Sequence, residues 1–270
     1  MEPTGNQTID GVLERVMKRI KENSQDLDQS KITTSSQMKK EQEQKKNSYD
    51  CALCKDTSWI IDFNGVAKRC KCFETHNIKD QWKAAGLKPY DLDKTFTTYI
   101  PWNAVTKELK TTATNYIMRY EKIKDTKYNS ILLCGNPGAG KTHLSIALAN
   151  NFMKKGNKVV YMPYRDVITS LKQNMLDKEY YQKLIGKYQE AEILLIDDLW
   201  KGKVNETDIN IMFEIVNYRY INKKPIICST EYLIENMLSF DEAIGSRIYE
   251  MAKDFTYEVR GKENNYRLRG

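Results

Sequence analysis

The chain has 270 residues, of which 40% are hydrophobic, and its 43 Lys and Arg against 36 Asp and Glu give a net charge of +7. This mild charge permits an acidic or nucleic-acid partner, but it excludes a protein that binds DNA by charge alone. No run of about 18 apolar residues occurs, and the first residues lack the basic start and apolar stretch of a signal peptide, so we expect no contact with a membrane. Cysteines in a chain without an export signal indicate a reducing compartment, so we expect a cytoplasmic protein.

Residues 1–48 are predicted to form an amphipathic helix followed by a flexible linker. Apolar side chains recur at helical spacing from Ile9 to Ile20, and residues 23–47 are polar with mixed charge. A lone helix of about three turns is marginal in water, so its apolar face must be buried. The helix packs either on the globular domain or on a partner protein, and the sequence leaves both open.

Residues 49–92 are predicted to form a small zinc-binding unit and a connecting helix. Two close cysteine pairs lie within 22 residues: Cys51, Cys54, Cys70 and Cys72. Such pairs on either side of an apolar run and a glycine turn are typical of a structural Cys₄ zinc site on a hairpin. His76 is a weaker alternative ligand, and redox cysteines or a disulfide pair are the other interpretations.

Residues 93–270 alternate short apolar runs with helical stretches. We expect strands at residues 131–134, 159–162, 193–196 and 226–228, with a further one at 255–260. Helices are expected between them at residues 142–155, 166–188 and 205–221. This alternation predicts an α/β domain built on a parallel sheet.

The strongest motif is a phosphate-binding loop between the strand at 131–134 and the helix that follows it. Eight residues match the pattern G-x-x-x-x-G-K-[ST]: Gly135, Asn136, Pro137, Gly138, Ala139, Gly140, Lys141 and Thr142. Glycines let backbone N–H groups turn inward around a phosphate, and the helix N-terminus adds positive potential. We expect Lys141 to contact the β- and γ-phosphates of a nucleotide and the Thr142 hydroxyl to ligate Mg²⁺.

Two carboxylates follow the apolar run at 193–196, 55 residues after Thr142. Asp197 is the predicted second Mg²⁺ ligand, and Asp198 is the predicted general base that orients the attacking water. The side chain of Asp198 is shorter than that of a glutamate, which predicts slow or conditional hydrolysis.

Polar residues after the strand at 226–228 complete the predicted site. The carboxyl ends of central parallel strands meet at the ligand, so Ser229 or Thr230 is expected beside the γ-phosphate. Ordinary loop chemistry after a strand is the alternative for these two residues. From the residues alone, Arg247 and Arg267 are as readily surface arginines as functional ones.

Together these motifs resemble those of the DnaC/DnaI-type bacterial helicase loaders, AAA+ ATPases close to the IstB-type transposition helpers. The resemblance covers residues 93–270. It is carried by the loop with its following His-Leu, the Asp-Asp-Leu strand end, the Gly-Ser-Arg box that ends at Arg247 and the Tyr-Arg that ends at Arg267. The cysteine unit resembles the zinc unit that precedes the ATPase in many loaders.

The resemblance implies an ATPase that binds a hexameric replicative helicase, self-associates on it or on DNA, and delivers it to single-stranded DNA at replication initiation. ATP, Mg²⁺ and Zn²⁺ are the expected cofactors, and assembly or DNA is expected to stimulate a slow turnover. By the family pattern Ser229 or Thr230 is the first sensor, and Glu231, where many relatives carry Asn, leaves the choice open. Arg247 is then an arginine finger acting across a subunit interface, and Arg267 holds the second-sensor position. No sizeable helical lid is expected, because too few residues follow the last strand.

Two other functions fit the same motifs. One is an IstB-like transposition helper that coats duplex DNA, and the other is a nucleotide-gated adaptor that binds ATP with little turnover. The zinc unit, the N-terminal helix and the lack of an obvious basic N-terminal arm favour the loader over the helper.

Residues 166–188 are a candidate surface for single-stranded DNA. They interleave lysines with tyrosines: Lys172, Lys178, Lys183, Lys187, Tyr180, Tyr181 and Tyr188. Lysines suit the phosphate backbone and aromatic rings suit base stacking, whereas an ordinary solvated helix face is the alternative.

Overall fold

The computed structural model describes residues 51–55, 57–61, 65–70 and 83–268. The helix and linker predicted within residues 1–48 lie outside the described residues, as do Cys72 and His76. Within the described ranges, no helix has the length and apolar character needed to cross a membrane.

A two-stranded hairpin contains the sequence between the two cysteine pairs. Strand β1 (Trp59–Ile61) pairs antiparallel with β2 (Ala67–Arg69), and Trp59 lies opposite Arg69. The Arg69 guanidinium lies 4.3 Å from the centroid of the Trp59 ring, a cation–π contact across the two strands. The hairpin predicted here is therefore confirmed.

A five-stranded sheet forms the centre of residues 83–268. Its order is β4 (Val159–Pro163), β5 (Ile193–Leu199), β6 (Ile226–Thr230), β3 (Ile131–Gly135) and β7 (Thr256–Val259). All neighbouring strands run parallel. The strands fall on the predicted apolar runs, because a strand covered on both faces needs apolar side chains on both. The predicted parallel α/β sheet is confirmed.

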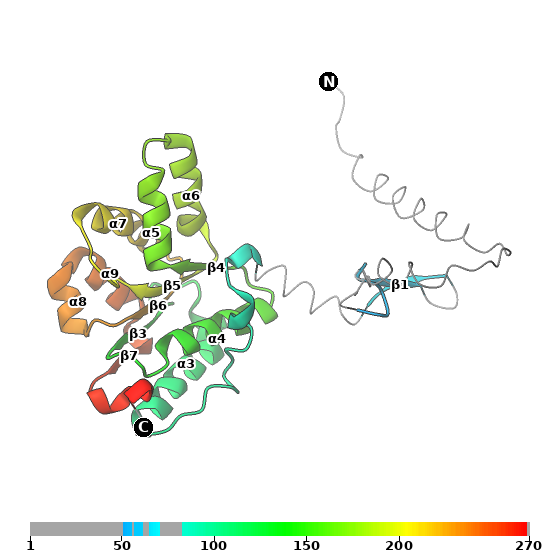
Figure 1. The fold of residues 1–270 in the computed structure, drawn as a ribbon, viewed down its shortest axis with the longest axis horizontal. Helices are drawn as coiled ribbons and strands as arrows, with labels where there is room; N and C mark the ends of the chain where they lie inside the picture. The colour runs from blue at the N-terminus through cyan, green and yellow to red at the C-terminus, as the bar shows by residue number, and fades with distance from the viewer. Residues whose placement is uncertain (1–50, 56, 62–64, 71–82, 269–270) are drawn as a thin grey trace, which may run out of the picture. The chain divides into compact units, whose positions relative to one another are not determined.

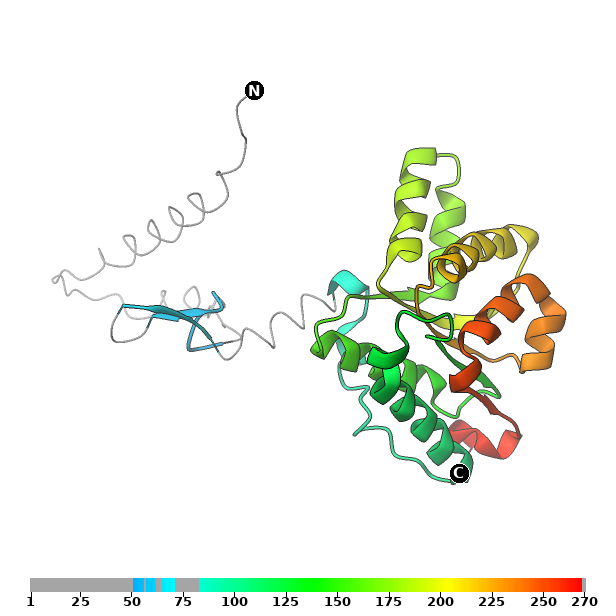
Figure 2. The same cartoon turned by 180° about the vertical axis from the view of Figure 1, so that it is seen from behind.

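Helices cover both faces of this sheet (Figures 1 and 2). One face carries α3 (Ala104–Ile123) and α4 (Lys141–Lys154). The other carries α5 (Tyr164–Gln173), α6 (Lys178–Glu190), α7 (Glu206–Ile221), α8 (Ile234–Phe240) and α9 (Glu242–Met251). The remaining described helical residues are an α-helical segment at 83–85 and 3₁₀ turns at Pro89–Asp91, Lys253–Phe255, Lys262–Asn264 and Tyr266–Leu268. Beyond β7 the described chain contains only two such turns, which are too short to form a helical lid.

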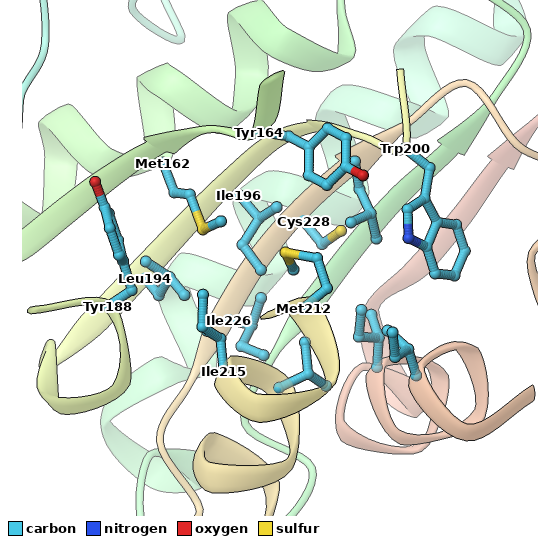
Figure 3. Packing of buried hydrophobic residues seen from close by; sticks show 14 of the residues in the cluster. Met162, Tyr164, Tyr188, Leu194, Ile196, Trp200, Met212, Ile215, Ile226 and Cys228 are labelled. Carbon is cyan, nitrogen blue, oxygen red and sulfur yellow. The ribbon is translucent and has the colours of Figure 1, made fainter. Parts of the chain in front are cut away.

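Each helical layer buries its own apolar cluster against the sheet. Leu194 and Ile196 of β5 belong to the cluster under α5, α7 and α9, which Figure 3 shows. Ile193 and Leu195 of the same strand belong to the cluster under α3 and α4. Side chains of a strand alternate between its two faces, so one apolar run supplies both cores.

The single helical stretch predicted at 166–188 is wrong in one respect, because two helices joined at residues 174–177 occupy it. Asp177 starts the second helix, since its carboxylate accepts a hydrogen bond from the Tyr180 N–H at 3.0 Å. The C-terminal end of α6 is held by Arg219, which is fully buried and donates hydrogen bonds to four main-chain carbonyls, those of Tyr188, Gln189, Ala191 and Pro225.

Candidate functional site

Three glycines give the predicted phosphate loop its shape between β3 and α4. Gly135, Gly138 and Gly140 have φ angles of 96°, 84° and 86°, in the left-handed region that favours glycine. A Cβ atom on Gly138 would lie 1.9 Å from Oδ1 of Asn265, and one on Gly140 would lie 2.5 Å from the ring of Tyr99. The loop therefore needs glycine both for its backbone and for the close approach of its neighbours.

Main-chain hydrogen bonds fasten the start of the loop to the ends of the two strands beside β3. The Gly135 N–H donates to the carbonyl of Tyr232, just after β6, at 2.8 Å. The Asn136 N–H donates to the carbonyl of Val259, the last residue of β7, also at 2.8 Å. The loop is thus held in place before any ligand binds, which reduces the cost of ordering it around a phosphate.

Aromatic side chains line a pocket of about 430 Å³ beside the loop. The Tyr99 hydroxyl donates to the Ala139 carbonyl at 2.7 Å, and the Tyr266 N–H donates to the Gly138 carbonyl at 3.2 Å. The rings of Tyr266 and Trp102 lie with their centroids 5.1 Å apart. The lining residues are Thr98, Tyr99, Ile100, Trp102, Gly138, Gly140, His143 and Tyr266. A hollow with aromatic walls next to a phosphate loop has the shape and chemistry to hold a purine base.

Lys141 lies at the centre of the loop. Its ammonium donates to the carbonyls of Gly135 and Asn136, each at 2.7 Å. Burial lowers the pKa of Lys141 to about 8, although the nearby carboxylates of Glu231 and Asp198 counteract this effect. Among the described residues, the hydrogen bonds of this ammonium go to loop carbonyls, and a phosphate group would add a negative charge beside it.

Asp197 stands at the bulge in the pairing of β5 with β6 and joins three hydroxyl groups. Its Oδ1 accepts a hydrogen bond from Ser229 at 2.5 Å, and its Oδ2 accepts one from Tyr161 at 3.2 Å. Burial raises the pKa of this carboxyl group, and hydrogen bonds from Ser229, Thr142 and Tyr161 oppose that rise. The hydroxyl group of Thr142 thus opposes the rise in the pKa of Asp197, and the hard oxygen atoms of these two predicted Mg²⁺ ligands fit that ion.

Asp198, the predicted general base, follows in a left-handed conformation with a φ of 55°. Its N–H donates to the Ser229 hydroxyl oxygen at 2.9 Å, so both carboxylate residues are tied to one serine. Its Oδ2 lies 2.7 Å from Nζ of Lys201, which in turn lies 3.3 Å from Oε1 of Glu231. Lys201 is a site residue that sequence reasoning missed, and its only signal was a basic residue in the turn after the carboxylates.

The hydroxyl groups of Ser229 and Thr230 are used differently. Ser229 bridges Asp197 and Asp198, as described above. Thr230 donates to the Leu199 carbonyl at 2.9 Å and accepts from the Tyr232 N–H at 3.2 Å, so its hydroxyl serves the main chain. Successive residues of a strand face opposite sides, so of these two predicted first-sensor residues it is Ser229 that contacts the carboxylate pair.

The two predicted arginines lie in different surroundings. Arg247 on α9 donates from Nε to the Asn217 side chain at 3.1 Å, and its guanidinium lies 5.2 and 5.5 Å from the centroids of two aromatic rings of α7. Among the described residues, its bonds and ring contacts are all with α7 and α9. Arg267 is exposed in the last 3₁₀ turn, where its N–H donates to Oδ1 of Asn265 at 3.1 Å. Within the described part of the chain, neither side chain makes a hydrogen bond or ion pair with the phosphate loop.

Three of the four predicted zinc ligands lie together. The sulfur atoms of Cys51, Cys54 and Cys70 all lie within 4.8 Å of one another. Cys54 and Cys70 are buried, with 5% and 3% of their surfaces exposed. Three thiols at this spacing suit one tetrahedral Zn²⁺, for which Cys72 is the predicted fourth ligand.

This fold and its loop recur in known proteins. Residues 85–270 match the family of IstB-like ATP binding proteins. The chain is 37% identical over 236 residues to the phage-like element PBSX protein XkdC of Bacillus subtilis (strain 168), which covers 82% of this chain and 87% of that protein. Its fold is similar to the crystal structure of the DnaC helicase loader, with a TM-score of 0.52 and 23% identity over 64% of this chain and 100% of that one. The crystal structure of DnaI matches with a TM-score of 0.53 and 18% identity over 64% of this chain and 93% of that one.

Proposed function

Because the chain belongs to the family of IstB-like ATP binding proteins, we propose that it is an AAA+ ATPase that loads a hexameric replicative helicase onto single-stranded DNA. The observation that carries the ATPase part is the strand order, in which β6 pairs with both β3 and β5, so that the phosphate loop and the carboxylate pair lie at the same edge of the sheet. A phosphate-binding loop beside a carboxylate pair supplies groups that position and activate water for phosphoryl transfer.

In this proposal the side chains divide the chemistry of hydrolysis among them. Loop N–H groups and Lys141 bind and neutralise the phosphates, and the aromatic pocket beside the loop holds the adenine base. Thr142 and Asp197 hold Mg²⁺, which when bound neutralises charge on the phosphate oxygens. Asp198 accepts a proton from the attacking water, while Ser229 holds the Asp197 carboxylate and the main chain of Asp198 in place.

The proposal also includes a structural metal ion bound by cysteines. We propose that Cys51, Cys54, Cys70 and Cys72 hold one Zn²⁺, and that residues 1–92 form the helicase-binding region in front of the ATPase domain at 93–270. The closeness of three of the sulfur atoms supports the zinc site. Reduced cysteines and ATP as substrate suit a cytoplasmic protein.

Two features support a role on replicating DNA. The motifs that the chain shares with the DnaC/DnaI-type loaders include the loop, the carboxylate pair and the box around Arg247. The relative XkdC is named as a protein of a phage-like element. We propose that this chain also acts in the replication of such an element. We assign the arginine finger to Arg247 and the second-sensor position to Arg267.

A loading assay tests the proposal and separates it from its alternatives. Full-length protein is first used to capture a hexameric helicase from a host lysate, and transfer of that helicase onto closed circular single-stranded DNA is then measured with ATP. Transfer by the wild type, with none by Lys141→Ala, is expected of a loader. The family relation favours one alternative, a helper that coats duplex DNA in the presence of ATP and leaves the helicase alone. Binding of ATP without turnover, with or without DNA and helicase, would indicate an adaptor.

A further inference from the structure

Lys201 forms a bridge between two carboxylates beside the phosphate loop. Its ammonium lies 2.7 Å from Asp198 and 3.3 Å from Glu231. Burial lowers the pKa of Lys141, Glu231 and Asp198 counteract that effect, and Lys201 adds to it. The three charges of the bridge therefore lie close enough to the loop lysine to affect its ammonium.

The turn that carries Lys201 is fixed by the protein core. Trp200 is 1% exposed and lies among buried side chains, as Figure 3 shows, with its ring centroid 5.7 Å from that of Tyr232 and 4.8 Å from that of Phe240. The Lys201 N–H donates to the Asp198 carbonyl at 3.0 Å. Because Trp200 is anchored in the core, the backbone of Lys201 stays close to Asp198. Opening of the ion pair therefore needs no movement of the Lys201 backbone.

The bridge has a consequence for the general base. An ammonium hydrogen-bonded to Oδ2 of Asp198 occupies one of the two carboxylate oxygens that a water molecule could approach. Glu231 contacts the same ammonium, so its negative charge offsets part of the attraction between Lys201 and Asp198. Side chains of Lys201, Asp198 and Glu231 are 45%, 31% and 37% exposed, and ion pairs with this exposure are weak enough to open.

We propose that Lys201 restrains Asp198 and thereby keeps unstimulated ATP hydrolysis slow, and that Glu231 weakens this restraint by neutralising part of the charge of the ammonium. The proposal rests on the ATPase function proposed above. It makes Lys201 and Glu231 positioning residues that act through Asp198, with opposite effects on turnover.

The first test measures unstimulated ATP turnover of the full chain. Lys201→Met is expected to raise kcat about threefold to fivefold, the effect that an exposed ion pair allows, with little change in KM. Glu231→Gln is expected to lower kcat by a similar factor, and Lys201→Arg should behave like the wild type. The matched control is Lys203→Met, because Lys203 is exposed two residues away and makes no ion pair within the described part of the chain.

Asp198→Asn separates a positioning role from a structural one. If Lys201 acts through Asp198, then Lys201→Met gives no gain of turnover in the Asp198→Asn background. A gain that persists in that background, or equal effects of the Lys201→Met and Lys203→Met changes, overturns the proposal.

The second test needs no turnover. Limited acetylation by N-hydroxysuccinimidyl acetate, read by peptide mass spectrometry, compares Lys201 with Lys203 in the nucleotide-free protein. Lys201 should be the slower of the two, and the Asp198→Asn/Glu231→Gln double variant should remove its protection. Equal rates in the wild type overturn the bridge itself. If the wild type hydrolyses no ATP under any condition, or Asp198→Asn turns over normally, the proposed function fails, and acetylation still decides the bridge.

Discussion

Gly138 is the residue at which the phosphate loop meets the C-terminal tail. Its carbonyl accepts the N–H of Tyr266, and its Cα faces Asn265 so closely that a Cβ would come within 2.9 Å of the Asn265 Cα. Tyr266 in turn forms a wall of the pocket together with Trp102. A side chain at Gly138 would therefore displace both the phosphate loop and the proposed base pocket.

Gly138→Ala is predicted to lower the affinity for ATP at least tenfold, because the new methyl group collides with Asn265 and the backbone is left-handed there. Titration with a fluorescent ATP analogue measures the loss. Gly156→Ala is the matched control, since Gly156 has a φ of 90° but nothing within 4 Å of a Cβ. That variant should lose about 1 kcal/mol of stability and keep its affinity. Equal affinities of the two variants would contradict this account.

Residue identities predicted the loop and the carboxylate pair, but not the contacts that tune them. The pattern around Lys141 and the apolar run before Asp197 are local, so a single pass along the chain finds them. Tyr161 and Lys201 reach the carboxylates through sheet pairing and a left-handed turn, which leave no mark in the sequence. The alternation of a strand indicates that Ser229 and Thr230 face opposite sides, yet it does not tell which of them faces Asp197.

The pair α5 and α6 changes the expected DNA surface. Tyr188 is 5% exposed, and Lys172 pairs at 2.7 Å with the buried Asp208, so these two residues are committed to the domain itself. Tyr180 is 47% exposed, and Leu176 at the turn between the helices is 99% exposed. A single strand of DNA would therefore meet the outer face of α6 and the turn that precedes it.

Tyr180→Ala is predicted to weaken binding of single-stranded DNA by about fivefold or more, because stacking on one base contributes about 1–3 kcal/mol. Fluorescence anisotropy with a labelled oligonucleotide, at two salt concentrations, measures the change. Tyr249→Ala, which removes a tyrosine that is 38% exposed on α9, serves as the control. Wild-type affinity in Tyr180→Ala would remove this segment from the DNA surface.

Strands and helices could be predicted from the sequence where a single pattern of apolar residues dominates the segment. The strands β3, β5 and β6 are buried along most or all of their length and the edge strand β4 is partly buried, so each begins with a run of apolar residues. The break between α5 and α6 was missed because Met175 and Leu176 continue the helical spacing of apolar residues even though they are exposed. Asp177, the polar residue that caps α6, interrupts the helical spacing of apolar residues at a single position.

The cysteine unit carries its own prediction. Freshly purified, reduced protein should contain about one zinc per chain by elemental analysis, because thiolates at this spacing close a tetrahedral site. Cys51→Ser should lose the metal, and with it helicase binding, while nucleotide affinity is kept, because folding of such units is coupled to metal binding. Cys228→Ala, which removes a buried thiol on β6, should keep the zinc. Protein without zinc would rule out the site.

At the scale of the whole molecule, the strand order assembles the site from distant parts of the chain. The loop follows β3 and the carboxylates lie near the C-terminal end of β5, and β6 lies between these two strands and supplies Ser229. The sequence alone predicts a parallel sheet but not this order, which depends on how the helical connections cross the sheet. Arg247 stays with α7 and α9, so a role for it at the phosphates requires the site of a second subunit.

Mixing two inactive variants tests this requirement. Lys141→Ala is predicted to lose productive ATP binding, whereas Arg247→Ala should bind ATP normally and lose the stimulation that assembly on helicase or DNA brings, by about 10³-fold if it is an arginine finger. In a mixture, one subunit contributes an intact pocket and its neighbour an intact finger, so part of the stimulated turnover should return. Arg119→Ala, which removes an exposed arginine on α3, should stay fully active. If the mixture stays inactive although both variants still assemble, Arg247 does not act across a subunit interface.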